Sequence, residues 1–166
     1  NQVLHHLADD ATAGWPAHQR VFAEFARVLK PGGITVINSC SHSQLEQGFW
    51  FYQLIPEAVG RVQQRTADLD VLGSLLQHSG FGEVGHETAT DIIMQGDTYF
   101  DADRVLDPQW RAGDSIWALA TPAERENALQ KVRTLADQGE LQSFMRRHDE
   151  TRLHSGQLSF TWAVLA

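Results

Sequence analysis

An amphipathic helix signal, a Gly-Gly turn and a β-branched apolar run follow one another near the start of the chain, and this order constrains the fold most. The helix signal covers 17–29, and its apolar stripe consists of Val21, Phe22, Phe25, Val28 and Leu29. Pro16 suits the first helical turn, and the turn 30–33 ends the helix. The run 34–37 predicts a strand buried on both faces of a parallel sheet, because it is short, apolar and β-branched.

Further helix and strand signals continue to the end of the chain. Thr121-Pro122-Ala123-Glu124 combines a Thr cap, a proline in the first turn and a glutamate three residues after the cap, which is typical of a helix start. The other predictions, in chain order, are a polar loop over 38–47, one or two short helices over 48–62, a helix over 69–79 ended by Gly80, a strand in the second half of 83–94, helices over 122–138 and 141–147, and an alternating strand over 158–165.

Composition narrows the class of partner. The net charge of −8 argues against a nucleic acid, which binds basic surfaces. No apolar run is long enough for a membrane span and no signal peptide opens the chain, so we expect a cytoplasmic protein without a membrane partner. Cys40 is the single cysteine, and the eight histidines form no HxxxH or HExxH spacing. No metal site is therefore predicted.

Three stretches near the start carry recognisable motifs, namely Asn1-Gln2-Val3-Leu4-His5-His6-Leu7, Asp9-Asp10 and Arg27-Val28-Leu29-Lys30-Pro31-Gly32-Gly33. They resemble, in that order, the strand end, the acidic loop and the "R-V-L-K-P-G-G" in the middle of the class I S-adenosylmethionine-dependent methyltransferase family. Ser79-Gly80-Phe81 looks like the "A-G-F" that leads into its sixth strand.

The resemblance implies an α/β fold, namely a partial Rossmann-like methyltransferase sheet with strands four/five to seven. The run 34–37 would be strand five and 158–165 the antiparallel strand seven, with a helical insertion over about 95–157 before it. We expect a single domain over 1–166 that corresponds to the C-terminal portion of the fold. The cofactor-binding glycine turn and acidic residue of the family would lie upstream, so we expect this chain alone to bind S-adenosyl-L-methionine weakly or not at all.

The resemblance also implies a function, methyl transfer from S-adenosyl-L-methionine to a small-molecule acceptor. The turn at 1–6 would pass beside the cofactor, which makes Asn1 and Gln2 candidate cofactor contacts. His6 or His5 is the candidate catalytic base, because imidazole titrates near neutral pH. The alternative is structural, with His5 packed under the following helix and His6 bonded to backbone.

Candidate substrate contacts follow strand five. Ser39 and His42 lie in the polar segment after it, where α/β folds bind ligands, although such a loop can also satisfy only its own turns. Trp50 and Tyr52 belong to an aromatic segment that forms either a substrate lid or core. The inserted segment with Trp110, Arg111, Asp114 and Trp117 would cap the substrate pocket or form a dimer surface.

Residues 80–85 spell G-x-G-x-x-G, but a nucleotide cradle needs a strand before it and a helix after it, and here the predicted order is reversed. As an alternative to the enzyme, the chain could be a non-catalytic remnant of the fold that self-associates through an unpaired sheet edge. That edge predicts a homo-oligomer, such as a homodimer, under either interpretation.

Overall fold

The computed structural model describes residues 3–7 and 9–166, which form two compact units. Unit 1 takes in Asn1–His42, Gln63–Ala89 and Leu158–Ala166, and unit 2 takes in Ser43–Val62 and Thr90–Gln157. The insertion predicted over about 95–157 falls in unit 2. That both units belong to a single domain stays a prediction.

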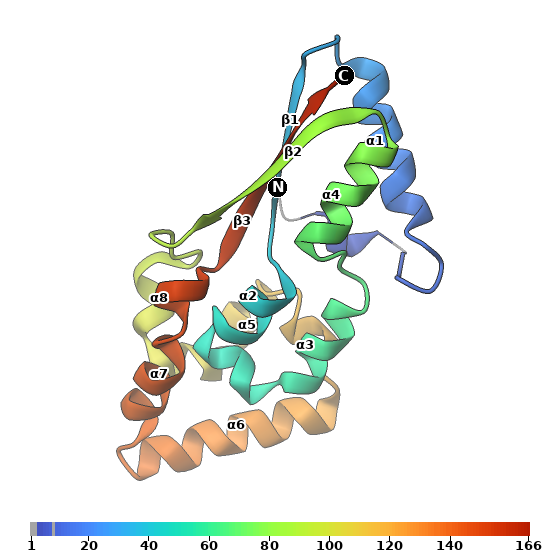
Figure 1. Cartoon of the computed structure of the whole chain (residues 1–166). Coiled ribbons are helices and arrows are strands. Elements are labelled where there is room, and N and C mark those ends of the chain that lie inside the picture. Colours follow the sequence, from blue (N-terminus) through green and yellow to red (C-terminus); the bar gives the residue numbers. More distant parts are fainter. Residues whose placement is uncertain (1–2, 8) are drawn as a thin grey trace. The chain divides into compact units, whose positions relative to one another are not determined.

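Unit 1 is built on a three-stranded sheet in the order β1-β3-β2 (Figure 1). The strands are β1 (Ile34–Ser39), β2 (Phe81–Ala89) and β3 (Leu158–Leu165). Strand β3 lies between the other two and runs antiparallel to both. The predicted bounds and antiparallel direction of the last strand are thus confirmed. The expectation that residues 34–37 form a strand of a parallel sheet is wrong for the pairing that is observed, because β1 pairs with β3 in the antiparallel direction.

Strand β1 is also not buried on both faces. Ile34 and Val36 are 60% and 59% exposed, whereas Ile37 is only 7% exposed. The difference arises because the side chains of a strand alternate between two faces, and the two helices that pack on this sheet, α1 and α4, lie together on the face of Ile37 (Figure 1).

Two helices form the rest of the core of unit 1. Helix α1 (Pro16–Val28) begins with the predicted proline, and α4 (Leu69–His78) is capped by the side chain of Asp68. Gly80, with φ of +100°, follows α4 in the left-handed region that favours glycine. The buried core residues are Trp15, Phe22, Ile37, Ala67, Leu72, Leu75, Leu76, Phe81 and Ala163.

Strand β2 begins and ends earlier than its sequence pattern indicates, so the strand predicted in the second half of 83–94 is wrong for residues 90–94. The alternation pointed to the second half of 83–94, but the ladder with β3 runs from Phe81 to Ala89 and contains an irregularity between Phe81 and Glu83. Two glycines in this stretch, Gly82 and Gly85, carry no side chain and hide the alternation. The structure does confirm that residues 80–85 follow a helix and lead into a strand.

Unit 2 is helical among its described elements, and its long helix α6 (Pro122–Asp137) begins as predicted, with Thr121 Oγ1 accepting a hydrogen bond from the Glu124 N–H. The loop predicted over 38–47 is partly wrong, because α2 (His42–Gln47) forms there. The other elements are η2 (Trp50–Leu54), α3 (Pro56–Gln63), η3 (Gly96–Phe100), η4 (Ala102–Leu106), α5 (Pro108–Ala112), η5 (Trp117–Leu119), α7 (Leu141–Asp149) and α8 (Arg152–Ser155).

Candidate functional site

The two candidate catalytic histidines form a single turn of 3-10 helix, η1 (Leu4–His6). Their ring centroids are 4.0 Å apart, with His5 half-buried and His6 exposed. Burial lowers the pKa of His5, and the neighbouring charge of His6 lowers it further. The His6 ring is therefore the more accessible of the two to an incoming molecule.

The candidate cofactor contacts Asn1 and Gln2 lie outside the described residues, so their role stays a prediction. The glycines of residues 80–85 do not form a nucleotide-binding turn either. The Leu165 side chain lies 3.9 Å from the position that a Cβ of Gly80 would take, and the Trp162 ring fills the space over Gly85. Residues 80–85 thus show no cradle for the nucleoside part of S-adenosyl-L-methionine.

A buried contact between a carboxylate and an imidazole, which the sequence interpretation did not identify, lies directly after the His5–His6 turn. His18 Nδ1 is 2.8 Å from Asp9 Oδ2, and the two side chains are 1% and 0% exposed. Asp9 was noted only as part of an acidic loop, and His18 carries no recognisable signal, because a histidine in the first turn of a helix has no motif around it.

The candidate substrate contacts Ser39 and His42 lie at and beyond the end of β1. Ser39 is buried, and its Oγ has no hydrogen-bond partner among the described residues. His42 is held in place by two contacts, with its Nε2 2.7 Å from the Thr66 carbonyl oxygen and its backbone N–H donating to Asp68. Substrate contact by either residue stays a prediction.

The sheet adds polar side chains beside Ser39. Ser39 is paired with Ser159 on β3, whose Oγ is 3.2 Å from Thr88 Oγ1 on β2. Two register positions earlier on β2, His86 Nδ1 is 2.9 Å from Thr161 Oγ1. Because β1 and β2 both run antiparallel to β3, their C-terminal ends lie at the same end of the sheet. Hydroxyl groups and an imidazole therefore lie toward this end of the sheet.

Trp50 and Tyr52 lie inside unit 2. Trp50 is 1% exposed and donates from Nε1 to the Tyr99 carbonyl oxygen at 3.0 Å. The hydroxyl of Tyr52 donates to Asp114 at 3.0 Å, and burial raises the pKa of that carboxyl. Both aromatic rings pack in the core in this structure, and a lid role for them stays a prediction.

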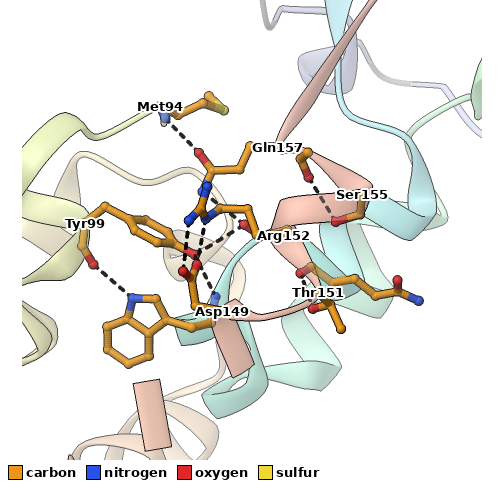
Figure 2. A network of polar contacts seen from close by, with 11 residues as sticks. Met94, Tyr99, Asp149, Thr151, Arg152, Ser155 and Gln157 are labelled. Carbon is orange, nitrogen blue, oxygen red and sulfur yellow. Dashed lines mark hydrogen bonds and ion pairs between the residues drawn. The ribbon is translucent and has the colours of Figure 1, made fainter. Parts of the chain in front are cut away.

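A polar network holds this part of unit 2 together (Figure 2). The Asp149 carboxylate accepts from the Tyr99 hydroxyl at 2.6 Å and from two nitrogens of Arg152 at 2.6 and 2.9 Å. Burial and the adjacent Asp149 raise the pKa of Tyr99 well above its usual range. The side chain of Gln157 accepts from the Met94 N–H and donates to the Gly48 carbonyl oxygen. The network thereby ties together segments far apart in the sequence.

Within 3–7 and 9–166, no three His, Cys, Asp or Glu side chains gather as metal ligands would. No helix there is both long and apolar enough to cross a membrane.

Comparison with known proteins gives a structural match. No protein-family model matches the chain, and no curated protein matches it either. A solved structure from Anabaena variabilis, named as a methyltransferase from an antibiotic biosynthesis pathway, matches with a TM-score of 0.68 and 22% sequence identity. The match covers 89% of this chain and 60% of that one, so the chain spans about three fifths of the length of the protein it resembles. The chain therefore has a fold found in a protein named as a methyltransferase.

Proposed function

We propose that the chain is the C-terminal portion of a class I S-adenosylmethionine-dependent methyltransferase that acts on a small-molecule acceptor in the cytoplasm. The observation that carries this proposal is the structural match over 89% of the chain. The position of β3, antiparallel to both neighbours, supports it further, because the family resemblance expects an antiparallel last strand.

In this proposal, residues of this chain contact the acceptor and remove its proton. His6, exposed beside the half-buried His5, takes the proton that the acceptor loses, since a neutral imidazole is a base near neutral pH. The polar side chains at the ends of β1 and β2 contact the acceptor, since ligands of α/β folds bind at the C-terminal ends of strands. The cofactor supplies the methyl group, and its binding requires residues other than those described here.

The proposal is tested by calorimetric titration of S-adenosylhomocysteine into two proteins. One is the 166-residue chain, and the other is the same chain with whatever polypeptide its gene encodes upstream. We expect binding by the longer protein and weak or no binding by the shorter. If neither binds, the chain is not part of a methyltransferase that uses this cofactor.

A second candidate function is that of a non-catalytic, self-associating module, and one observation favours it. Strand β1 lies at the edge of the sheet and carries no charged residue or proline over its six positions, Ile34–Ser39. Natural edge strands usually carry such residues, because they prevent pairing with other chains. The other edge strand, β2, has an irregular register and carries Glu83, His86 and Glu87.

A further inference from the structure

The buried Asp9–His18 pair has a geometry that a simple helix cap does not need. A single oxygen, Asp9 Oδ2, accepts from the backbone N–H of His18 and lies against its ring Nδ1, each at 2.8 Å. His18 is the third residue of α1, whose first amides have no partner within the helix. The N-cap residue, Trp15, makes no side-chain cap hydrogen bond. Asp9 therefore caps α1 from six residues upstream of the N-cap.

The ring of His18 is held in one orientation. Because the carboxylate of Asp9 can only accept, the hydrogen lies on Nδ1 of His18. The ring edge-packs against Trp15 and Phe22, with centroid distances of 5.1 and 6.1 Å. A buried, charge-assisted contact of this kind is among the stronger hydrogen bonds in proteins. The pair thus gives the segment around Asp9 a fixed place on α1.

The same segment continues backward into the His5–His6 turn. The backbone N–H of Asp9 donates to the Leu7 carbonyl oxygen at 2.9 Å, and that of Leu7 donates to Leu4 at 3.0 Å. Leu4 packs against the core of unit 1. The turn that carries the two histidines is therefore attached at one end by Leu4 and at the other by Asp9.

We propose that Asp9 and His18 are positioning residues that hold the His5–His6 turn in the geometry needed for proton transfer. The role in proton transfer rests on the proposed function, whereas the hold on the turn does not. Neither residue touches the acceptor in this proposal, since both are buried. They act through the hydrogen bond from the Asp9 backbone N–H to the carbonyl oxygen of Leu7, the residue that follows the turn.

The neighbouring Asp10 provides a matched control. Its Oδ1 accepts from the Thr12 hydroxyl at 2.6 Å and from the Ala13 N–H at 2.9 Å. Like Asp9, Asp10 thus accepts two hydrogen bonds at one carboxylate oxygen, but the donors belong to its own exposed loop and not to α1. Substitution of Asp10 removes a loop carboxylate without touching the proposed device.

The experiment follows the histidine rings of the 166-residue chain by NMR while pH is varied. In the wild type the His5 midpoint lies below that of an ordinary histidine, because of burial and His6. In Asp9→Ala we expect the His5 midpoint to rise and the contact between the two rings to be lost. Asp10→Ala should leave both unchanged. His18→Leu should act like Asp9→Ala, and His18→Asn, which keeps a donor near the Nδ1 position, should behave like the wild type.

The proposal is overturned if Asp9→Ala and His18→Leu fold and titrate like the wild type. Should both variants fail to fold, hydrogen exchange of the wild type decides. The backbone amides of Leu7 and His18 should then show equal protection, because one opening event exposes both. Much faster exchange at Leu7 would show that the turn moves independently of the pair. Neither readout involves a cofactor, so a failure of methyl transfer alone would overturn only the proposed function.

Discussion

The indole ring of Trp162 on β3 lies over Gly85, its cross-strand partner on β2, in the space that a Cβ atom of residue 85 would occupy. The close approach is possible only because glycine has no side chain. Gly85 therefore has a packing role, although it belongs to a stretch that matches the nucleotide-binding pattern G-x-G-x-x-G.

Substitution Gly85→Ala should destabilise the chain. The added methyl group must displace the large Trp162 ring, and overpacking of this kind costs about 1–3 kcal/mol. Urea denaturation should show a lower unfolding midpoint. The control is Gly60→Ala in α3, where a Cβ atom would meet no atom within 4 Å. That change should stabilise by up to about 1 kcal/mol, since alanine favours helix. Equal midpoints for Gly85→Ala and the wild type would contradict the close contact.

Removal of Asp149 should be one of the most costly single changes in unit 2. Arg152 would lose its partner while 7% exposed, and loss of one partner of a buried ion pair costs about 3–5 kcal/mol. Thermal and urea unfolding of Asp149→Ala should both show this loss. In the exposed pair of Arg104 and Asp101, Asp101→Ala should cost about 0–1 kcal/mol. Similar losses in the two variants would contradict the structural role of the network in Figure 2.

Protonation of Asp9 at acid pH should lower the stability of unit 1. Burial alone would raise the pKa of Asp9, but the hydrogen bonds and charge of His18 lower it below its usual value of 3.8. A carboxyl with a lowered pKa in the folded state stabilises above its unfolded pKa, and this contribution is lost as pH falls through the folded value. The free energy of unfolding of Asp9→Asn should therefore fall less steeply below about pH 4 than that of the wild type.

Asp114 should have the opposite effect on the way the free energy of unfolding varies with pH. Burial raises its pKa, so its ionisation costs more in the folded than in the unfolded state. This penalty is absent below the unfolded pKa and grows as pH rises toward the folded value. As pH rises from the unfolded pKa toward the folded pKa of Asp114, the Asp114→Asn variant should therefore become more stable relative to the wild type. Urea unfolding at a series of pH values measures both slopes, and identical slopes in both variants would contradict the two assignments.

The exposed edge strand predicts concentration-dependent self-association. Val36 on β1 and Val28 at the end of α1 are 59% and 60% exposed, yet only Val36 lies on the unpaired edge. A lysine on an edge strand opposes pairing with another chain. Sedimentation equilibrium should therefore show that Val36→Lys weakens association and that Val28→Lys does not. A monomeric wild type, or equal effects of the two substitutions, would contradict pairing through β1.

Local sequence signals predicted most of the elements. The apolar stripe of α1, the cap at Thr121 and the alternation of β3 are all encoded by adjacent residues, and these elements were found as predicted. The direction of the β1 neighbour was not encoded locally, because β3 comes about 120 residues later in the chain. The early start of β2 escaped recognition because Gly82 and Gly85 interrupt its pattern.

The site was less predictable than the fold. His5 and His6 stood out because imidazoles are chemically distinctive and occur next to each other. The Asp9–His18 pair had no comparable signal, since nine residues separate its members and only the turn between them brings them together. Trp50 and Tyr52 show the converse, because aromatic composition alone does not distinguish a lid from a core.

Substitution His6→Ala should impair catalysis without unfolding the protein. His6 is exposed, so its removal leaves no cavity, whereas loss of a general base reduces kcat by about 10²–10⁴-fold. The assay uses the chain together with its upstream polypeptide and an acceptor found by screening. His78→Ala is the control, because that ring is also exposed and its Nδ1 lies 2.6 Å from the Ser74 carbonyl oxygen of its own helix. A His6→Ala variant with wild-type kcat would exclude His6 as the base.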